Sequence, residues 1–147
     1  MKLTTLECNR QIAASPEEVY DVWIDPESPG GPWFSPNNDK QQSKTILAAK
    51  VDGLFYHSVS VPAQNMVFTH YGRFTRMERG AVVEHTWVSE ATQGRESVVT
   101  TTFTAVDGGT LVRLTHSGLP DDDHAKQRLA GWQWVLGALA QRLGKSR

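Results

Sequence analysis

Ala125-Lys-Gln-Arg-Leu-Ala-Gly-Trp-Gln-Trp-Val-Leu-Gly-Ala-Leu-Ala-Gln-Arg-Leu143 has the clearest periodicity in the chain. Its main apolar residues recur at steps of four or three and form one stripe on a helix: Ala125, Leu129, Trp132, Leu136, Leu139 and Leu143. The acidic run Asp121–Asp123 precedes the stripe, where negative charge complements a helix dipole. The pattern predicts a helix of about five turns that needs a large apolar surface opposite it.

The N-terminal segment predicts a strand followed by a short helix. Residues 3–13 alternate between apolar and polar side chains, as half-buried strands do. Ser15-Pro-Glu-Glu18 is a helix start, because Ser15 can cap, proline suits the first helical position and Glu18 completes a capping box. This helix should end before Asp25-Pro26. Residues 26–43 are rich in proline, glycine and polar residues and predict a loop with one further helical turn.

The middle of the chain predicts a series of antiparallel strands. Strand patterns cover residues 44–50, 53–61, 66–78, 81–89, 95–106 and 109–117. Most of the connections are short and contain glycine or polar turn residues, which favours hairpins between successive strands. We therefore predict a single α+β domain over residues 1–147. In it, a curved antiparallel sheet wraps around the long C-terminal helix, with two short helices near the N-terminus and a cavity between sheet and helix.

Composition and charge exclude several functional classes. The 147 residues carry a net charge of −1, and the basic residues are interspersed with acidic ones, so no basic footprint of a nucleic-acid-binding protein is present. No apolar run reaches the roughly 18 residues of a membrane span. The N-terminus has no apolar segment typical of a signal peptide. One cysteine excludes an internal disulfide, and we expect a cytoplasmic protein.

Strand parity predicts which side chains face the cavity, because alternate residues of a strand point to the same side of a sheet. Two aromatic residues inside the polar loop after the first helix should cover the same space. The candidate ligand-binding residues are Trp33, Phe34, Phe55, His57, His70, Phe74, His85, Trp87, Thr101, Phe103, Leu114, His116, Trp132 and Leu136. Trp134 lies away from the helix stripe, and we place it against the end of the sheet or at a dimer contact.

Four of the five histidines fall on this inward parity. Each can be a neutral core residue with satisfied hydrogen bonds, or a polar group that orients a ligand in an apolar pocket. Neither carboxylates nor the cysteine share their spacing, so we predict no metal site. The chain contains no nucleophile elbow, phosphate loop, dinucleotide fingerprint or zinc-protease motif. We therefore assign no catalytic residue and no cofactor.

Three segments together resemble the SRPBCC (START-like) superfamily. They are Ala14-Ser-Pro-Glu-Glu-Val-Tyr-Asp-Val-Trp23, Glu84-His-Thr-Trp-Val88, and Leu114-Thr-His-Ser-Gly-Leu119 with the downstream Gly131-Trp132. Within the superfamily the chain looks most like the branch named after the activator of the heat-shock-protein-ninety ATPase. The resemblance implies the helix-grip fold with a central hydrophobic cavity. Ala48-Ala-Lys-Val-Asp-Gly-Leu-Phe55 departs from the branch pattern and keeps only its second glycine and its phenylalanine.

The leading functional prediction is a carrier or sensor that holds an apolar or amphipathic small molecule in the cavity. The branch name suggests one alternative, a stress-related co-chaperone-like module whose partner is a chaperone. The other alternative is an enzyme of the cyclase, dehydratase or hydrolase type that acts on a hydrophobic substrate in the same cavity. The expected partners are thus a hydrophobic small molecule or a chaperone, with no nucleic acid, and the protein should be a monomer or a homodimer.

Overall fold

The computed structural model describes residues 2–25, 43–61 and 66–144. Its elements follow one another along the chain as β1 (Leu3–Ile12), α1 (Pro16–Trp23), β2 (Ser43–Leu47), β3 (Leu54–Val61), β4 (Met66–Glu78), β5 (Val82–Ser89), the short 3₁₀ helix η3 (Glu90–Thr92), β6 (Ser97–Val106), β7 (Gly109–Pro120) and α2 (Ala125–Gly144). The predicted second short helix and the aromatic residues Trp33 and Phe34 lie outside the described residues.

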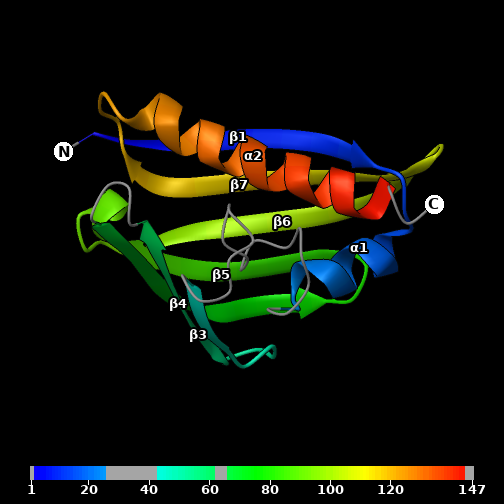
Figure 1. Cartoon of the computed structure of the whole chain (residues 1–147), viewed down its shortest axis with the longest axis horizontal. Helices are drawn as coiled ribbons and strands as arrows, with labels where there is room; N and C mark the ends of the chain where they lie inside the picture. Colours follow the sequence, from blue (N-terminus) through cyan, green and yellow to red (C-terminus); the bar gives the residue numbers. More distant parts are fainter. Residues whose placement is uncertain (1, 26–42, 62–65, 145–147) are drawn as a thin grey trace.

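The strands form one seven-stranded antiparallel sheet in the order β1-β7-β6-β5-β4-β3-β2. The first strand therefore lies beside the last, while the strands between them follow one another through hairpins. Strands β1, β7, β6 and β5 run side by side, β3 and part of β4 slant across them, and α2 lies over β1 and β7 (Figure 1). A curved sheet that holds a long C-terminal helix is the predicted α+β, helix-grip arrangement.

Helix α1 begins and ends as the sequence predicts. The backbone N–H of Glu18 donates to the Ser15 hydroxyl at 3.3 Å, and Pro16 occupies the first helical position. Its buried side chains face the sheet, where Tyr20 meets the Phe103 ring edge to face with centroids 5.6 Å apart. The Arg79 guanidinium binds both carboxylate oxygens of Asp21, at 3.0 and 2.8 Å, and ties the helix to the β4–β5 turn.

Helix α2 buries the predicted stripe. The side chains of Trp132, Leu136, Leu139 and Leu143 are buried, and Leu129 is half-buried beside them. The helix starts at Ala125, the first residue of that stripe. Strand β7 continues three residues beyond its predicted end, to Pro120, and its last residues pair with β1. Asp122 then accepts the backbone N–H of His124 at 2.9 Å, so the acidic run caps the chain just before the helix.

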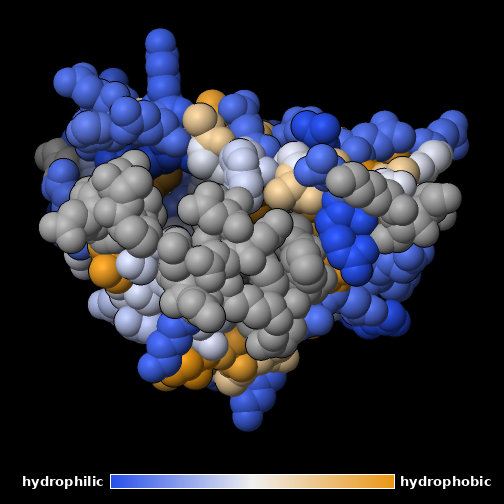
Figure 2. Space-filling model, viewed as in Figure 1, coloured by the Kyte–Doolittle hydropathy of each residue, from blue (hydrophilic) through white to orange (hydrophobic). Residues whose placement is uncertain are grey.

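Apolar side chains occur on both faces of the sheet, although alternation along the strands predicts them on the inner face only. The inner face carries the aromatic and aliphatic core, as predicted. The outer face of β2, β3 and β4 also exposes large apolar residues, namely Ile46, Leu54, Tyr56, Val67 and Tyr71. Figure 2 shows hydrophobic residues, in orange, at the lower edge of the molecule, where β3 lies in Figure 1. Among the described residues, no helix is long and apolar enough to cross a membrane.

Candidate functional site: a cavity between the sheet and α2

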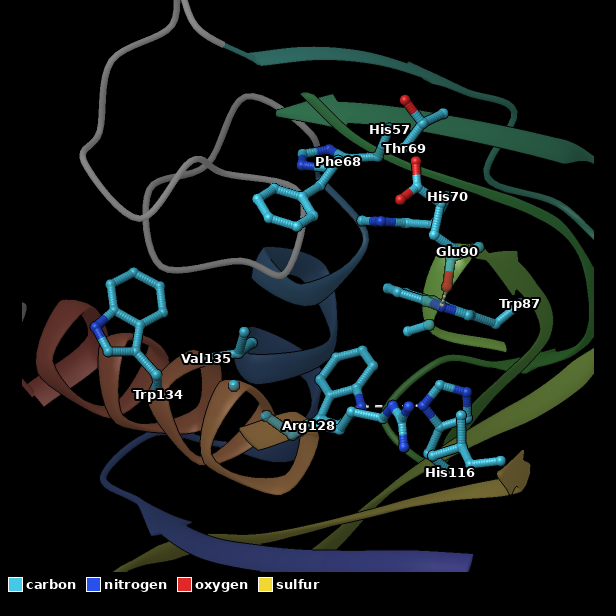
Figure 3. Close-up of a pocket in the computed structure, with 15 residues that line it drawn as sticks. His57, Phe68, Thr69, His70, Trp87, Glu90, His116, Arg128, Trp134 and Val135 are labelled. Carbon is cyan, nitrogen blue, oxygen red and sulfur yellow. Dashed lines mark hydrogen bonds between the residues drawn. The ribbon is translucent and has the colours of Figure 1, made fainter. Parts of the chain in front are cut away.

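A cavity of about 420 Å³ opens between α2 and the inner face of the sheet. Its walls come from β3, β4, β5, η3, β7 and α2, so residues far apart in the sequence meet there (Figure 3). The lining residues are His57, Phe68, Thr69, His70, Trp87, Ser89, Glu90, Ala91, His116, Leu119, Arg128, Gly131, Trp132, Trp134 and Val135. Aromatic rings are prominent in this set, and most of the surface that it presents to the cavity is apolar.

The wall below α2 is fixed by a chain of hydrogen bonds. The indole N–H of Trp132 donates to Nδ1 of His116 at 3.1 Å, drawn as a dashed line in Figure 3. Nε2 of His116 lies 2.8 Å from the Ser97 hydroxyl, which itself donates to the Trp87 carbonyl at 2.7 Å. Because Ser97 uses its proton on the carbonyl, it must accept from His116. The imidazole is therefore the neutral Nε2–H tautomer, and both ring nitrogens are occupied.

Burial keeps His116 neutral. Loss of water around the ring, together with the nearby His85 and Arg128, lowers its pKa to about 3. Protonation of Nδ1 would also break the hydrogen bond from Trp132. The Trp132 ring packs edge to face against both His116 and Trp87, with centroid separations of 5.9 and 5.3 Å. His116 thus connects the last strand to α2, as its position before Ser117-Gly-Leu-Pro120 suggests.

A stack of three rings forms the adjoining wall. His70 lies parallel to Trp87, with centroids 3.9 Å apart, and also stacks on His57 at 4.9 Å. The rings of His70 and Trp87 project side by side from their strands into the cavity (Figure 3). Nδ1 of His57 is hydrogen-bonded to the Thr45 hydroxyl at 2.8 Å. Burial lowers the pKa of His57 to about 4 and that of His70 well below its usual value, so both rings are neutral.

His85 lies behind this wall, in the core. Its Nδ1–H donates to the Thr86 carbonyl at 2.9 Å, and its ring packs edge to face on Phe55 at 4.9 Å. Burial lowers its pKa to about 4. The neighbouring Gly72 lets β4 approach this group closely. A Cβ at that position would collide with the Thr86 carbonyl oxygen and lie 2.8 Å from the Phe55 ring.

Two charged side chains, Arg128 and Glu90, are among the described lining residues. The Arg128 guanidinium binds both carboxylate oxygens of Asp122, at 2.9 and 3.0 Å, and also donates to the Pro120 carbonyl at 3.1 Å. The hydrogen bond from Arg128 lowers the pKa of Asp122, which stays ionised. This pair joins the start of α2 to the end of β7. Glu90, on η3, is the other charged lining residue and is exposed.

The structure divides the candidate residues into three groups. Five of them line the cavity: His57, His70, Trp87, His116 and Trp132. Seven lie buried outside the lining set, and form the core around it: Phe55, Phe74, His85, Thr101, Phe103, Leu114 and Leu136. Trp33 and Phe34 fall outside the described residues. Parity identifies the inward face, but it does not separate a residue at the cavity surface from one packed behind it.

Several lining residues were not among the candidates. Trp134 is 48% exposed and lines the cavity from α2, because the helix presents one flank as well as its buried stripe to the sheet. Phe68 shares the inward parity of His70 and could have been included on that ground. Thr69 has the outward parity, yet it lies at the cavity border. Glu90 and Ala91 come from η3, whose position no periodicity predicts.

The described side chains offer no ready metal centre. Among residues 2–25, 43–61 and 66–144, no group of three or more histidine, cysteine or acidic side chains is placed to hold an ion. The four inward histidines instead bond to, or stack on, neutral partners. The chemistry that this site offers is burial of apolar rings beside a few neutral hydrogen-bonding groups.

A comparison with known protein families identifies the family of this chain. The family described as "Activator of Hsp90 ATPase homolog 1-like protein" matches residues 13–144, nearly the whole chain. The chain belongs to this family. Curated proteins, by contrast, gave no match.

Solved structures share the fold of this family member. A protein from Chromobacterium violaceum is 22% identical, with a TM-score of 0.79 over 95% of this chain and 96% of that one. One from Rhizobium leguminosarum is 21% identical, with a TM-score of 0.79 over 98% and 96%. An AHSA1-like protein from Aeromonas hydrophila is 22% identical, with a TM-score of 0.71 over 97% and 94%. At these identities the likeness establishes the fold alone.

Proposed function

We propose that this protein binds a hydrophobic small molecule in the cavity under α2 and serves as a carrier or a sensor of that molecule. The volume of about 420 Å³ carries the proposal. Small-molecule sites have volumes of about 300–1,000 Å³, apolar walls and a small number of polar groups. The lining set has this composition, with four tryptophan and phenylalanine rings beside neutral histidines: Phe68, Trp87, Trp132 and Trp134.

The cavity interrupts the packing between α2 and the sheet. Protein interiors are close-packed, and voids larger than a water molecule are few. An apolar space left unfilled costs stability, because the side chains around it lose dispersion contacts and their burial is incomplete. The aromatic wall is held in place by the His116 and His57 hydrogen bonds, so the space does not depend on one flexible side chain. Occupation by a ligand would recover the missing contacts.

Gly131 provides a direct test. It lines the cavity from α2, and a Cβ built on it would meet no atom within 4 Å. In Gly131→Leu the new side chain should occupy the space, and replacing a helical glycine should raise stability by up to about 1 kcal/mol. We expect the affinity for a fluorescent apolar dye such as Nile red to fall at least tenfold. Dye titration, together with native mass spectrometry of gently purified protein, measures this change.

Gly144→Leu is the matched control. Gly144 ends α2, has equally open space around it and lies outside the lining set, so this variant should bind the dye as the wild type does. Wild-type affinity in Gly131→Leu would move the binding site away from this cavity. Failure of the wild type to take up any compound from a library of lipids and aromatic compounds would contradict the proposal as a whole.

A second candidate function is binding to a chaperone. The family is named after an activator of a chaperone ATPase, and the exposed apolar residues on the outer face of β2, β3 and β4 would suit a protein partner. A stimulated ATPase rate at a stoichiometric amount of this protein would favour the role. Loss of that effect in Tyr71→Lys, with dye binding retained, would place the partner on the outer face.

Either role fits the cytoplasm, where we place the protein because its single cysteine suits a reducing compartment. The apolar outer face could also pair two copies. Light scattering after gel filtration would separate a monomer from a homodimer.

A further inference from the structure

The four inward histidines differ in how their nitrogens are used. His116 is bonded through both ring nitrogens, to Trp132 and Ser97. His57 bonds to Thr45, and His85 bonds to the Thr86 carbonyl. The ring nitrogens of His70 make no hydrogen bond with any residue that the structure describes. His70 is half-buried and lines the cavity, which leaves its nitrogens available to a molecule bound there.

The His70 ring is also held rigidly. It lies between Trp87, at 3.9 Å and an interplanar angle of 15°, and His57, at 4.9 Å and 26°. Phe55 meets its side at 6.4 Å. With both faces covered, the imidazole can interact with a ligand only along its edge, which points into the cavity in Figure 3. Because a neutral imidazole carries one N–H donor and one acceptor, it can bond to a hydroxyl or a carbonyl group.

The rest of the wall favours flat rings. Trp87 and Trp132 meet at 5.3 Å and 61°, so two indole faces at a steep angle border the space, and Phe68 and Trp134 add further rings. Aromatic pairs gain energy from stacked and edge-to-face contacts beyond that of burial alone. A rigid planar ligand also loses less conformational entropy on binding than an alkyl chain does.

Charge at the cavity disfavours an anionic ligand. Arg128, the one cation among the described lining residues, already binds both carboxylate oxygens of Asp122. Only Nε of Arg128 lacks a hydrogen-bond partner among the described residues, so a ligand carboxylate would have to share a guanidinium whose charge Asp122 already neutralises. Burial of that extra negative charge is costly. Glu90 adds a negative charge at the border, and the histidines are neutral because they are buried.

We infer that the ligand is a neutral, planar aromatic molecule that presents a hydroxyl or carbonyl group to the edge of the His70 ring. This inference rests on the proposed function and specifies the chemical class of its ligand. The position of the polar group follows from His70, and the planar shape follows from the indole walls around it.

Three probes separate the parts of this inference in calorimetric titrations of the wild-type protein. They are 2-naphthol, naphthalene and decanoate. We expect 2-naphthol to bind about tenfold more tightly than naphthalene, the effect of one added hydrogen bond, although naphthalene is the more hydrophobic compound. Decanoate should bind more weakly than both aromatic probes.

His70→Phe is the decisive variant, because it keeps an aromatic ring between Trp87 and His57 and removes the nitrogens. The preference for 2-naphthol over naphthalene should disappear, while the affinity for naphthalene stays within about twofold of the wild-type value. His124→Ala, an exposed histidine outside the lining set, is the control and should keep the tenfold preference. In the wild type, ¹⁵N signals of the His70 ring should shift with 2-naphthol and not with naphthalene, a readout that does not depend on the variant folding.

Each outcome is informative. If the wild type binds the two aromatic probes equally, or His70→Phe keeps the preference, His70 does not bind the ligand's polar group. If decanoate binds more tightly than either aromatic probe, the ligand is an acyl chain, and the inference fails while the cavity function stands. If none of the probes nor Nile red binds, the proposed function itself is wrong.

Discussion

At the scale of a residue, two buried threonines show how the hydrogen bonding of one hydroxyl group affects stability. Thr101 and Thr110 are both fully buried, on β6 and β7. The Thr110 hydroxyl donates to the Ala14 carbonyl at 2.7 Å and so joins β7 to the chain between β1 and α1. The Thr101 hydroxyl has no hydrogen-bond partner among the described residues. A buried polar group without a partner costs stability, whereas a bonded one contributes.

The two threonines should therefore respond in opposite ways to the same substitution. Thr101→Val removes an unbonded hydroxyl at nearly constant shape, and we expect a gain of about 1 kcal/mol in the free energy of unfolding. Thr110→Val removes a bonded one and should cost about 1 kcal/mol or more. Urea denaturation of both variants measures the changes. A loss of stability in Thr101→Val would mean that its hydroxyl is bonded in solution.

At the scale of an element, α2 has two separate tasks. The stripe that includes Leu139 and Leu143 attaches the helix to the sheet. The flank that carries Gly131 and Trp134 borders the cavity. Trp132 belongs to both sets, but Leu139 and Leu143 lie outside the lining and Gly131 and Trp134 lie outside the buried stripe. At these positions stability and ligand binding can be changed independently.

Leu139→Ala tests this separation. Leu139 is fully buried and lies outside the lining set, so truncation should lower the free energy of unfolding by about 2–5 kcal/mol. Gln141→Ala, on the exposed face of the same helix, should change it by less than about 0.5 kcal/mol. Thermal unfolding and dye titration are the measurements. Dye affinity should be unchanged in both variants while they are folded, and a large loss in Leu139→Ala alone would show that the tasks are coupled.

At the scale of the whole molecule, the buried histidines make stability depend on pH. Burial lowers the pKa of His57 and His85 to about 4 and that of His116 to about 3, whereas an unfolded chain has histidine pKa values of about 6.5. Below pH 6.5 the unfolded state therefore binds more protons than the folded state. The contribution of these neutral rings to the free energy of unfolding is fully present above pH 6.5 and is lost as the pH falls toward 4.

We expect the free energy of unfolding to be level from pH 8 to 7 and to fall steeply between pH 6 and 4. Between the unfolded and folded pKa values, each buried histidine adds about 1.4 kcal/mol per pH unit to the slope of the free energy of unfolding against pH. Three of them together approach about 4 kcal/mol per unit. Urea unfolding at a series of pH values measures the slope, which should be the same in His124→Ala. Stability that stays constant from pH 7 to 5 would contradict the burial of these rings in their neutral form.

Local patterns were sufficient to predict most of the elements. Ser15 and Pro16 start α1, and the spacing of Leu129, Trp132 and Leu136 predicts α2, because capping and helical periodicity depend on residues a few positions apart. Alternation predicts the strands and the inward face of the sheet for the same reason. The extension of β7 to Pro120 was missed, since it depends on pairing with β1, at the other end of the chain.

The sequence by itself determined a curved antiparallel sheet, a long amphipathic helix over it, and which side of each strand faces that helix. Only the tertiary structure decided where packing stops and the cavity begins. It leaves His85 and Thr101 in the solid core and brings Trp134 to the cavity border. Among the described residues, it gives hydrogen-bond partners to three inward histidines but not to His70. The reason is physical: periodicity reports the direction of a side chain, whereas the space in front of it depends on contacts between distant segments.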